Sequence, residues 1–226
     1  PHTLSDFRVD HKEALDDMMT QVLAALLRHD AVELKRVAQD GTRVRASAGA
    51  ASFRRKKSLD ACLEEARRHV EAVAAEADDG ASEVQAAARK RAAQERIDRI
   101  QRAIEELPKA QEAKKSAEAK EQARVSTTDP EARVMKMADG GFRPAWNIQI
   151  ASDTRSRIIA AVSVDNRGSD RGNLDAIVTQ IRARTGRTPE EILADGGYVD
   201  HDDIVAIADK GVKPYIPLSS NKKSVA

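Results

Sequence analysis

The chain has 226 residues, which fits one domain of moderate size or a domain with a large insert. Its 41% hydrophobic and 3% aromatic content requires a core of mainly aliphatic side chains, and its formal net charge of +1 neither requires nor excludes a nucleic-acid partner. The single cysteine, Cys62, excludes an intrachain disulfide, and no apolar run approaches the roughly 20 residues of a membrane span, so we expect a cytoplasmic protein with no membrane partner.

Helical patterns dominate the first half of the chain. Apolar residues recur at spacings of three and four over residues 11–28, which predicts an amphipathic helix. Residues 32–38 are a candidate strand leading to Asp40-Gly41, although their alternation is poor. Residues 58–107 are expected to form a helical hairpin, because apolar residues follow a coiled-coil seam in each arm.

Turn and capping signals divide the expected hairpin. Asp78-Asp79-Gly80 is a turn signal, and Ser82 followed by Gln85 is a capping-box pattern that would start the second arm. Pro108 is expected to end or kink that arm, and residues 109–124 to form a solvated helix or a linker.

The second half of the chain mixes strand and helix patterns. A hairpin of two strands, followed by alternating helices and strands, implies a mixed sheet with helices on its faces, which is an α/β fold. In the first strand Trp146, Ile148 and Ile150 share one face, expected to be the core face, with Asn147 and Gln149 opposite. The expected elements are strands at 145–151, 157–164, 191–195 and 212–217 and helices at 171–184 and 201–209.

Two acidic residues have an unusual context. Asp40 follows the first candidate strand and Asp195 ends a better one, and each is followed by glycine. An acid at a strand end faces the crevice where sites form in open sheets, and glycine allows close approach by backbone or substrate. A simple turn is the alternative, and it explains Asp40-Gly41 better than Asp195-Gly196-Gly197.

Several ordered motifs resemble one family. Residues 37–46 around Asp40, residues 127–150, Ser169-Asp170 before a helix, and residues 192–198 resemble the DDE transposases of bacterial insertion sequences, whose catalytic domain is RNase H-like. The similarity covers nearly the whole chain. It implies an RNase H-like mixed sheet with flanking helices, interrupted by a helical-hairpin insert after the first strand.

The resemblance also implies a site and a chemistry. Asp40 and Asp195 would be two of three carboxylates that hold two divalent cations, Mg²⁺ or Mn²⁺, with the third, a helical Glu, expected beyond Ala226. Gly196, Gly197, Asn147 and Gln149 would support the site as motif positions. Double-stranded DNA, both the element's terminal repeats and the target, would be the substrate, and a homo-oligomer the working assembly. Arg133, Lys136 and Arg143 flank the matched segment and are candidates for DNA phosphate contacts, with a solvated loop as the alternative.

The expected domains follow from this comparison. They are a helical N-terminal region (1–31), the first part of the catalytic domain (32–53), the coiled-coil-like insert (54–126) and an incomplete remainder of the catalytic domain (127–226). The chain is expected to be cut at both ends and inactive alone. The alternatives are a related RNase H-like nuclease, and a non-catalytic remnant that acts only through its helical hairpin as an interaction or DNA-binding module.

Overall fold

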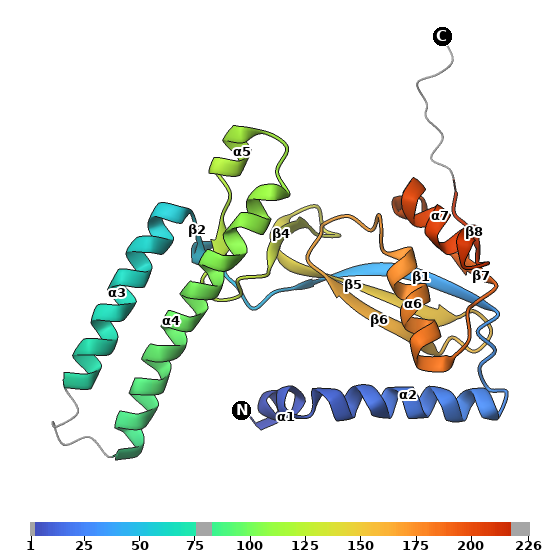
Figure 1. Ribbon diagram of the computed structural model, residues 1–226, viewed down its shortest axis with the longest axis horizontal. Coiled ribbons are helices and arrows are strands. Elements are labelled where there is room, and N and C mark those ends of the chain that lie inside the picture. Colours follow the sequence, from blue (N-terminus) through green and yellow to red (C-terminus); the bar gives the residue numbers. More distant parts are fainter. Residues whose placement is uncertain (1–2, 76–82, 218–226) are drawn as a thin grey trace, which may run out of the picture. The chain divides into compact units, whose positions relative to one another are not determined.

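The computed structural model describes residues 3–75 and 83–217 (Figure 1). The chain divides into two compact units. The first, here the sheet unit, comprises the residues up to Thr42, residues 147–165 and the residues from Ser169 onward. The second, here the hairpin unit, comprises residues 43–146 and 166–168, and therefore interrupts the sheet unit after its first strand.

A mixed sheet forms the centre of the sheet unit. Its strands run in the order β6, β5, β1, β7, β8, in which β5 and β6 are antiparallel and β1, β7 and β8 are parallel to one another. This arrangement confirms the expected α/β class with a mixed sheet. The strands are β1 (Arg36–Arg45), β5 (Phe142–Asp153), β6 (Ile159–Asp165), β7 (Glu191–Leu193) and β8 (Lys213–Tyr215).

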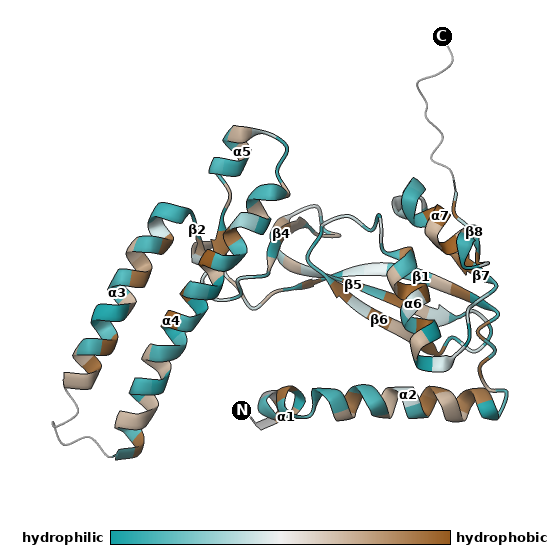
Figure 2. Cartoon of the chain, viewed as in Figure 1, coloured by the Kyte–Doolittle hydropathy of each residue, from teal (hydrophilic) through white to brown (hydrophobic). Residues whose placement is uncertain are grey.

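Helices flank this sheet. The helix α6 (Leu174–Thr185) packs against β6, α2 (Lys12–Arg28) and α7 (His201–Asp209), and α7 packs against β8 (Figure 1). The predicted apolar face of α6 is fully buried, at Leu174, Ile177, Val178 and Ile181. A short helix, α1 (Thr3–Asp10), precedes α2, and hydrophobic residues recur along α2 as the sequence predicts (Figure 2).

The hairpin unit is built on two long helices. The helices α3 (Lys56–Ala75) and α4 (Glu83–Glu112) pack side by side, and their shared seam buries apolar residues from both arms (Figure 1). The predicted hairpin is therefore confirmed, whereas its turn at 78–80 and the cap at Ser82 lie outside the described residues. The remaining elements of this unit are η1 (Ala50–Ser52), β2 (Phe53–Arg54), α5 (Ala117–Glu121), β3 (Val125–Ser126) and β4 (Arg133–Lys136), which pairs with the first part of β5.

Of the two effects expected of Pro108, an end or a kink, the end of the helix is wrong. The helix α4 continues through Pro108 to Glu112. Leu107 and Ala110 on either side are buried against Leu59 and Val125, and this packing offsets the hydrogen bond that proline removes.

Two expectations about the strands are also corrected. The strand β1 begins at Arg36 and runs through Gly41 to Arg45, so Asp40 lies within a strand and not after one. In β5 the core face carries Ala145, Asn147, Gln149 and Ala151, whereas Trp146 and its alternating neighbours are half-buried on the other face. The amide side chains of Asn147 and Gln149 thus lie on the buried face of β5, and Trp146 lies on the other face. Among the described helices, none combines the length and apolarity that a membrane crossing needs.

Candidate active site

The two singled-out acids follow the paired segments of neighbouring parallel strands. The strand β1 pairs with β7 through Arg36 with Glu191, Val37 with Ile192 and Ala38 with Leu193. Asp40 and Asp195 are each the second residue after the last pair. Because side chains two apart on a strand share a face, this register directs both acids to the same side at the same level.

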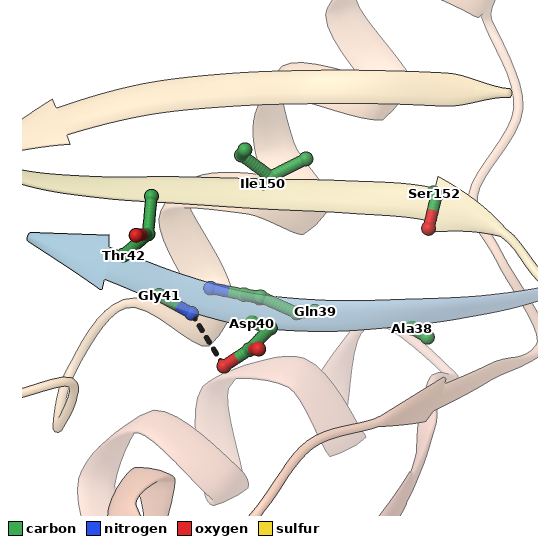
Figure 3. A pocket seen from close by; sticks show the side chains of 7 residues that line it. All are labelled: Ala38, Gln39, Asp40, Gly41, Thr42, Ile150 and Ser152. Atoms are coloured by element: carbon green, nitrogen blue, oxygen red, sulfur yellow. Dashed lines mark hydrogen bonds between the residues drawn. The ribbon is translucent and has the colours of Figure 1, made fainter. Parts of the chain in front are cut away.

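Each acid is anchored by its own backbone. The Gly41 amide donates to Asp40 Oδ1 at 2.8 Å, and Figure 3 shows the Asp40 side chain projecting from β1 on the side away from β5. The Gly197 amide donates to Asp195 Oδ1 at 2.7 Å, so Asp195 caps the short helix η2 (Gly196–Tyr198). Both carboxylates are exposed, and each therefore presents negative charge to solvent from a fixed backbone position.

A third acid, Asp170, lies beside the same strand ends. Its Oδ1 accepts hydrogen bonds from Asn147 Nδ2 at 2.8 Å and from Gln149 Nε2 at 2.9 Å. Both amides are fully buried on β5. In the sequence, Ser169-Asp170 stands out only as a motif before a helix, and Asp170 is not among the predicted site residues.

Gly41 and Gly197 leave room for the Asp170 carboxylate beside β1 and η2. A Cβ on Gly41 would lie 2.5 Å from Asp170 Oδ1 and 2.6 Å from Gln149 Nε2, so no larger residue fits unless the network moves. A Cβ on Gly197 would lie 2.9 Å from Asp195 Oδ1 and 3.8 Å from Asp170 Oδ2. One oxygen of Asp170 and one of Asp195 thus both lie within 4 Å of the position that a Cβ on Gly197 would take. At Gly196 the nearest atom would be the Pro217 carbonyl oxygen, at 3.2 Å.

Behind the acids, Gln149 connects four polar side chains. Its Oε1 accepts from Tyr198 Oη at 2.5 Å and from Gln39 Nε2 at 3.0 Å, while its Nε2 donates to Asp170 and to Asn147 Oδ1. Every hydrogen-bonding position of the Gln149 amide is occupied, so the amide cannot rotate without breaking several bonds.

The charges of all three acids affect the pKa of Tyr198. Burial, followed by the negative charges of Asp170, Asp40 and Asp195, raises the pKa of its phenol well above the ordinary value. The hydroxyl therefore stays protonated and continues to donate to Gln149 Oε1. Tyr198 is almost completely buried, which sequence reasoning had not anticipated for the residue that ends the Asp195-Gly196-Gly197-Tyr198 motif.

A residue of α7 binds the start of α6, just after the turn that contains Asp170. Asp203, 7% exposed, accepts hydrogen bonds from the backbone amides of Leu174 and Asp175 at 2.8 and 2.9 Å. Its carboxylate thus caps the N-terminus of α6, where the helix dipole favours a negative charge. This contact fixes the start of α6 four residues after Asp170.

A hollow lies beside β1 and β5. The hollow has a volume of about 280 Å³ and includes Asp40 in its wall (Figure 3). Residues of β1 and β5 line it: Ala38, Gln39, Asp40, Gly41, Thr42, Ile150 and Ser152.

The three basic residues considered for DNA contact lie in the hairpin unit. Arg133 donates to Glu106 Oε2 at 3.0 Å and to the Pro130 carbonyl oxygen at 2.8 Å, so its guanidinium is already engaged. Arg143 pairs with Asp139 at 2.7 Å, and Lys136 is exposed on β4. Lys136 is therefore the candidate with the most accessible side chain.

The donor set fits a hard divalent cation. Within residues 3–75 and 83–217, no group of three or more His, Cys, Asp or Glu side chains is arranged to hold a metal ion. Mg²⁺, however, commonly binds through one or two carboxylates and completes its octahedron with water and substrate phosphate. The exposed carboxylates of Asp40 and Asp195 are oxygen donors of the type that such a cation takes.

One comparison with known proteins gives a match. The family model for the transposase DDE domain matches residues 106–224, more than half of the chain. The fold is α/β with a mixed sheet, and the chain belongs to the transposase DDE domain family, whose members cut and transfer DNA and generally use divalent metal ions. No curated protein and no solved structure gives a significant match. Asn147, Gln149, Asp170 and Asp195 lie within the matched range and Asp40 lies before it, so the register of β1 with β7 is what relates Asp40 to the family's segment.

Proposed function

We propose that the chain carries the catalytic acids of a bacterial insertion-sequence transposase, with Asp40 and Asp195 as cation ligands in an RNase H-like sheet. The observation that carries this proposal is the β1–β7 register, which sets the two acids at the same level of adjacent parallel strands. The strand order β6, β5, β1, β7, β8 supports the RNase H-like assignment.

Asp40 and Asp195 each use Oδ1 to accept a backbone amide, which holds the carboxyl group in one orientation. Held in this way, the two side chains present oxygen ligands of the type that Mg²⁺ and Mn²⁺ take. Divalent cations bound there would supply activation of the attacking hydroxyl and stabilisation of the leaving oxygen in an in-line displacement at phosphorus.

The DNA backbone is negatively charged, so a DNA-binding surface needs basic side chains that contact phosphate. Lys136, exposed on β4, is the first candidate to contact phosphate, and Arg143 and Arg133 could do so only in addition to their present carboxylate partners. Phosphate contacts of this kind position a duplex without reading its sequence. Binding to terminal repeats and target, homo-oligomeric assembly and a cytoplasmic location remain predictions.

The decisive test is cation binding by variants that keep the local hydrogen bonds. In Asp195→Asn the amide oxygen can still cap η2 while the charge is lost, so we expect Mn²⁺ affinity, measured by calorimetry, to fall by more than about tenfold. Asp40→Asn should behave in the same way. Asp209→Asn is the matched control, because Asp209 is an exposed acid at the far end of α7. If Asp195→Asn binds Mn²⁺ as tightly as the parent chain does, the proposed site is wrong.

A further inference from the structure

Asp170 has more structural support than either of the acids that the resemblance assigns. Two fully buried amides, on Asn147 and Gln149, donate to its Oδ1. Burying amides costs free energy unless their donors are satisfied, so a carboxylate that accepts from both is needed at this place. The two hydrogen bonds also hold the Asp170 carboxyl group in one orientation.

The other oxygen of the same carboxylate lies near Gly197, the second residue after Asp195. Asp170 Oδ2 lies 3.8 Å from the point where a Cβ on Gly197 would stand, and Asp195 Oδ1 lies 2.9 Å from that point. Asp170 Oδ1 also lies 2.5 Å from the Cβ position of Gly41, the residue that follows Asp40. Asp170 is therefore close both to Gly41, directly after Asp40, and to Gly197, two residues after Asp195.

We propose that Asp170 is a positioning carboxylate of the cation site, held by Asn147 and Gln149, which strengthens cation binding through its charge and through a cation-bound water. This inference rests on the proposed function of Asp40 and Asp195. It adds to Asp40 and Asp195 a third acid, from the turn before α6. The network from Gln39 through Gln149 and Tyr198 then serves to keep one oxygen of Asp170 turned toward Gly197.

The charge of Asp170 can be removed with little change in shape. Asp170→Asn retains an oxygen that can accept from Asn147 and Gln149. We expect it to weaken Mn²⁺ binding in calorimetry by about tenfold, the size expected for one unit charge acting on a divalent ion over several ångströms at high effective dielectric. Asp170→Glu keeps the charge and should stay within about threefold of the parent, as a screened charge displaced by one methylene would. Asp209→Asn again controls for the change in net charge.

The outcomes separate this inference from the function on which it rests. If Asp195→Asn abolishes Mn²⁺ binding while Asp170→Asn leaves it unchanged, the proposed function stands and the role of Asp170 is refuted. If Asp170→Asn and Asp170→Glu lose affinity equally, Asp170 is structural only, which also refutes the inference. Should Asp170→Asn lose the circular dichroism spectrum of the folded chain, Asp170→Ser makes the same charge change with a smaller side chain, and affinity is judged on the variant that keeps the spectrum.

Discussion

The hairpin of α3 and α4 and the region around Asp40 and Asp195 on β1 and after β7 are held together in opposite ways. In the hairpin, apolar residues at regular spacing on two neighbouring segments pack into one seam, with Leu59 and Ala103 fully buried. In the other region, buried polar residues from distant segments satisfy one another, as Gln149 does with Tyr198 and Asp170. In the hairpin, many similar apolar contacts each contribute part of the stability. The other region depends on a few directional bonds.

The two regions should therefore respond differently to substitution. A seam loses stability in proportion to the apolar volume that is removed, whatever lies elsewhere in the chain. A polar network fails when one member is displaced, because the partners that remain buried lose their hydrogen bonds. Substitutions in the two regions should therefore separate stability from cation binding.

The largest expected effect is in the hairpin. Leu59 is fully buried, so Leu59→Ala should lower the free energy of unfolding of the hairpin unit by about 3 kcal/mol. Mn²⁺ affinity should not change. The measurement is urea unfolding followed by the fluorescence of Trp146, the chain's one tryptophan, which belongs to the hairpin unit.

Val84→Ala is the matched control, because Val84 on α4 is 79% exposed and its truncation leaves no cavity. A loss for Leu59→Ala no larger than that of Val84→Ala would contradict the seam as the source of this unit's stability.

An intermediate effect is expected at Gly41. A Cβ there would stand 2.5 Å from Asp170 Oδ1, so Gly41→Ala should cost about 1–3 kcal/mol by overpacking. It should also weaken Mn²⁺ binding, since Asp170 and Gln149 have to shift. Urea unfolding followed by circular dichroism gives the first quantity and calorimetry gives the second.

The control is Gly49→Ala, where no atom lies within 4 Å of the added Cβ and the backbone φ of −84° suits alanine. That change should stay within about 0.5 kcal/mol. Equal behaviour of the two alanine variants would show that the network at Gly41 yields easily, and that the strand ends are less constrained than the contacts imply.

The smallest expected effect is a pH dependence of the hairpin unit. Burial raises the pKa of Glu106, but the hydrogen bonds from Lys109 and Arg133 outweigh it, and the pKa lies below the ordinary 4.5. A lowered carboxyl pKa in the folded state gives stability that is present above pH 4.5 and is lost as the pH falls through the folded pKa.

Glu106→Gln should therefore flatten the acid limb of the stability curve, measured by Trp146 fluorescence between pH 6 and roughly pH 3, the range in which carboxylates titrate. Glu105→Gln, which changes the exposed neighbour on α4, should leave the curve as it is. An unchanged acid limb in Glu106→Gln would mean that other carboxylates control the acid sensitivity.

The amino-acid sequence alone predicted the helices α2, α3, α4, α6 and α7 and most of the strands. The periodicity of α6, α7 and the hairpin arms is local, so the pattern predicts both the element and its buried face. The strands that alternate or carry β-branched runs, β5 and β6, were predicted for the same reason. Asp195 was singled out because two glycines and a tyrosine after a short strand are more than a turn requires.

Tertiary structure decided the rest. Only pairing with β7 and β5 shows that β1 runs through Asp40 and Gly41 to Arg45, because strand pairing is a long-range interaction that a poorly alternating sequence does not specify. The core face of β5 is predicted on the wrong side, because hydropathy favours burial of Trp146 over burial of the amides. It contains no information about the hydrogen bonds that Asn147 forms with Asp170 and Gln149 with Tyr198. Buried polar groups are stable only with partners, and those partners come from segments far away in the chain. For this reason the sequence could single out two acids, whereas only the fold shows what surrounds them.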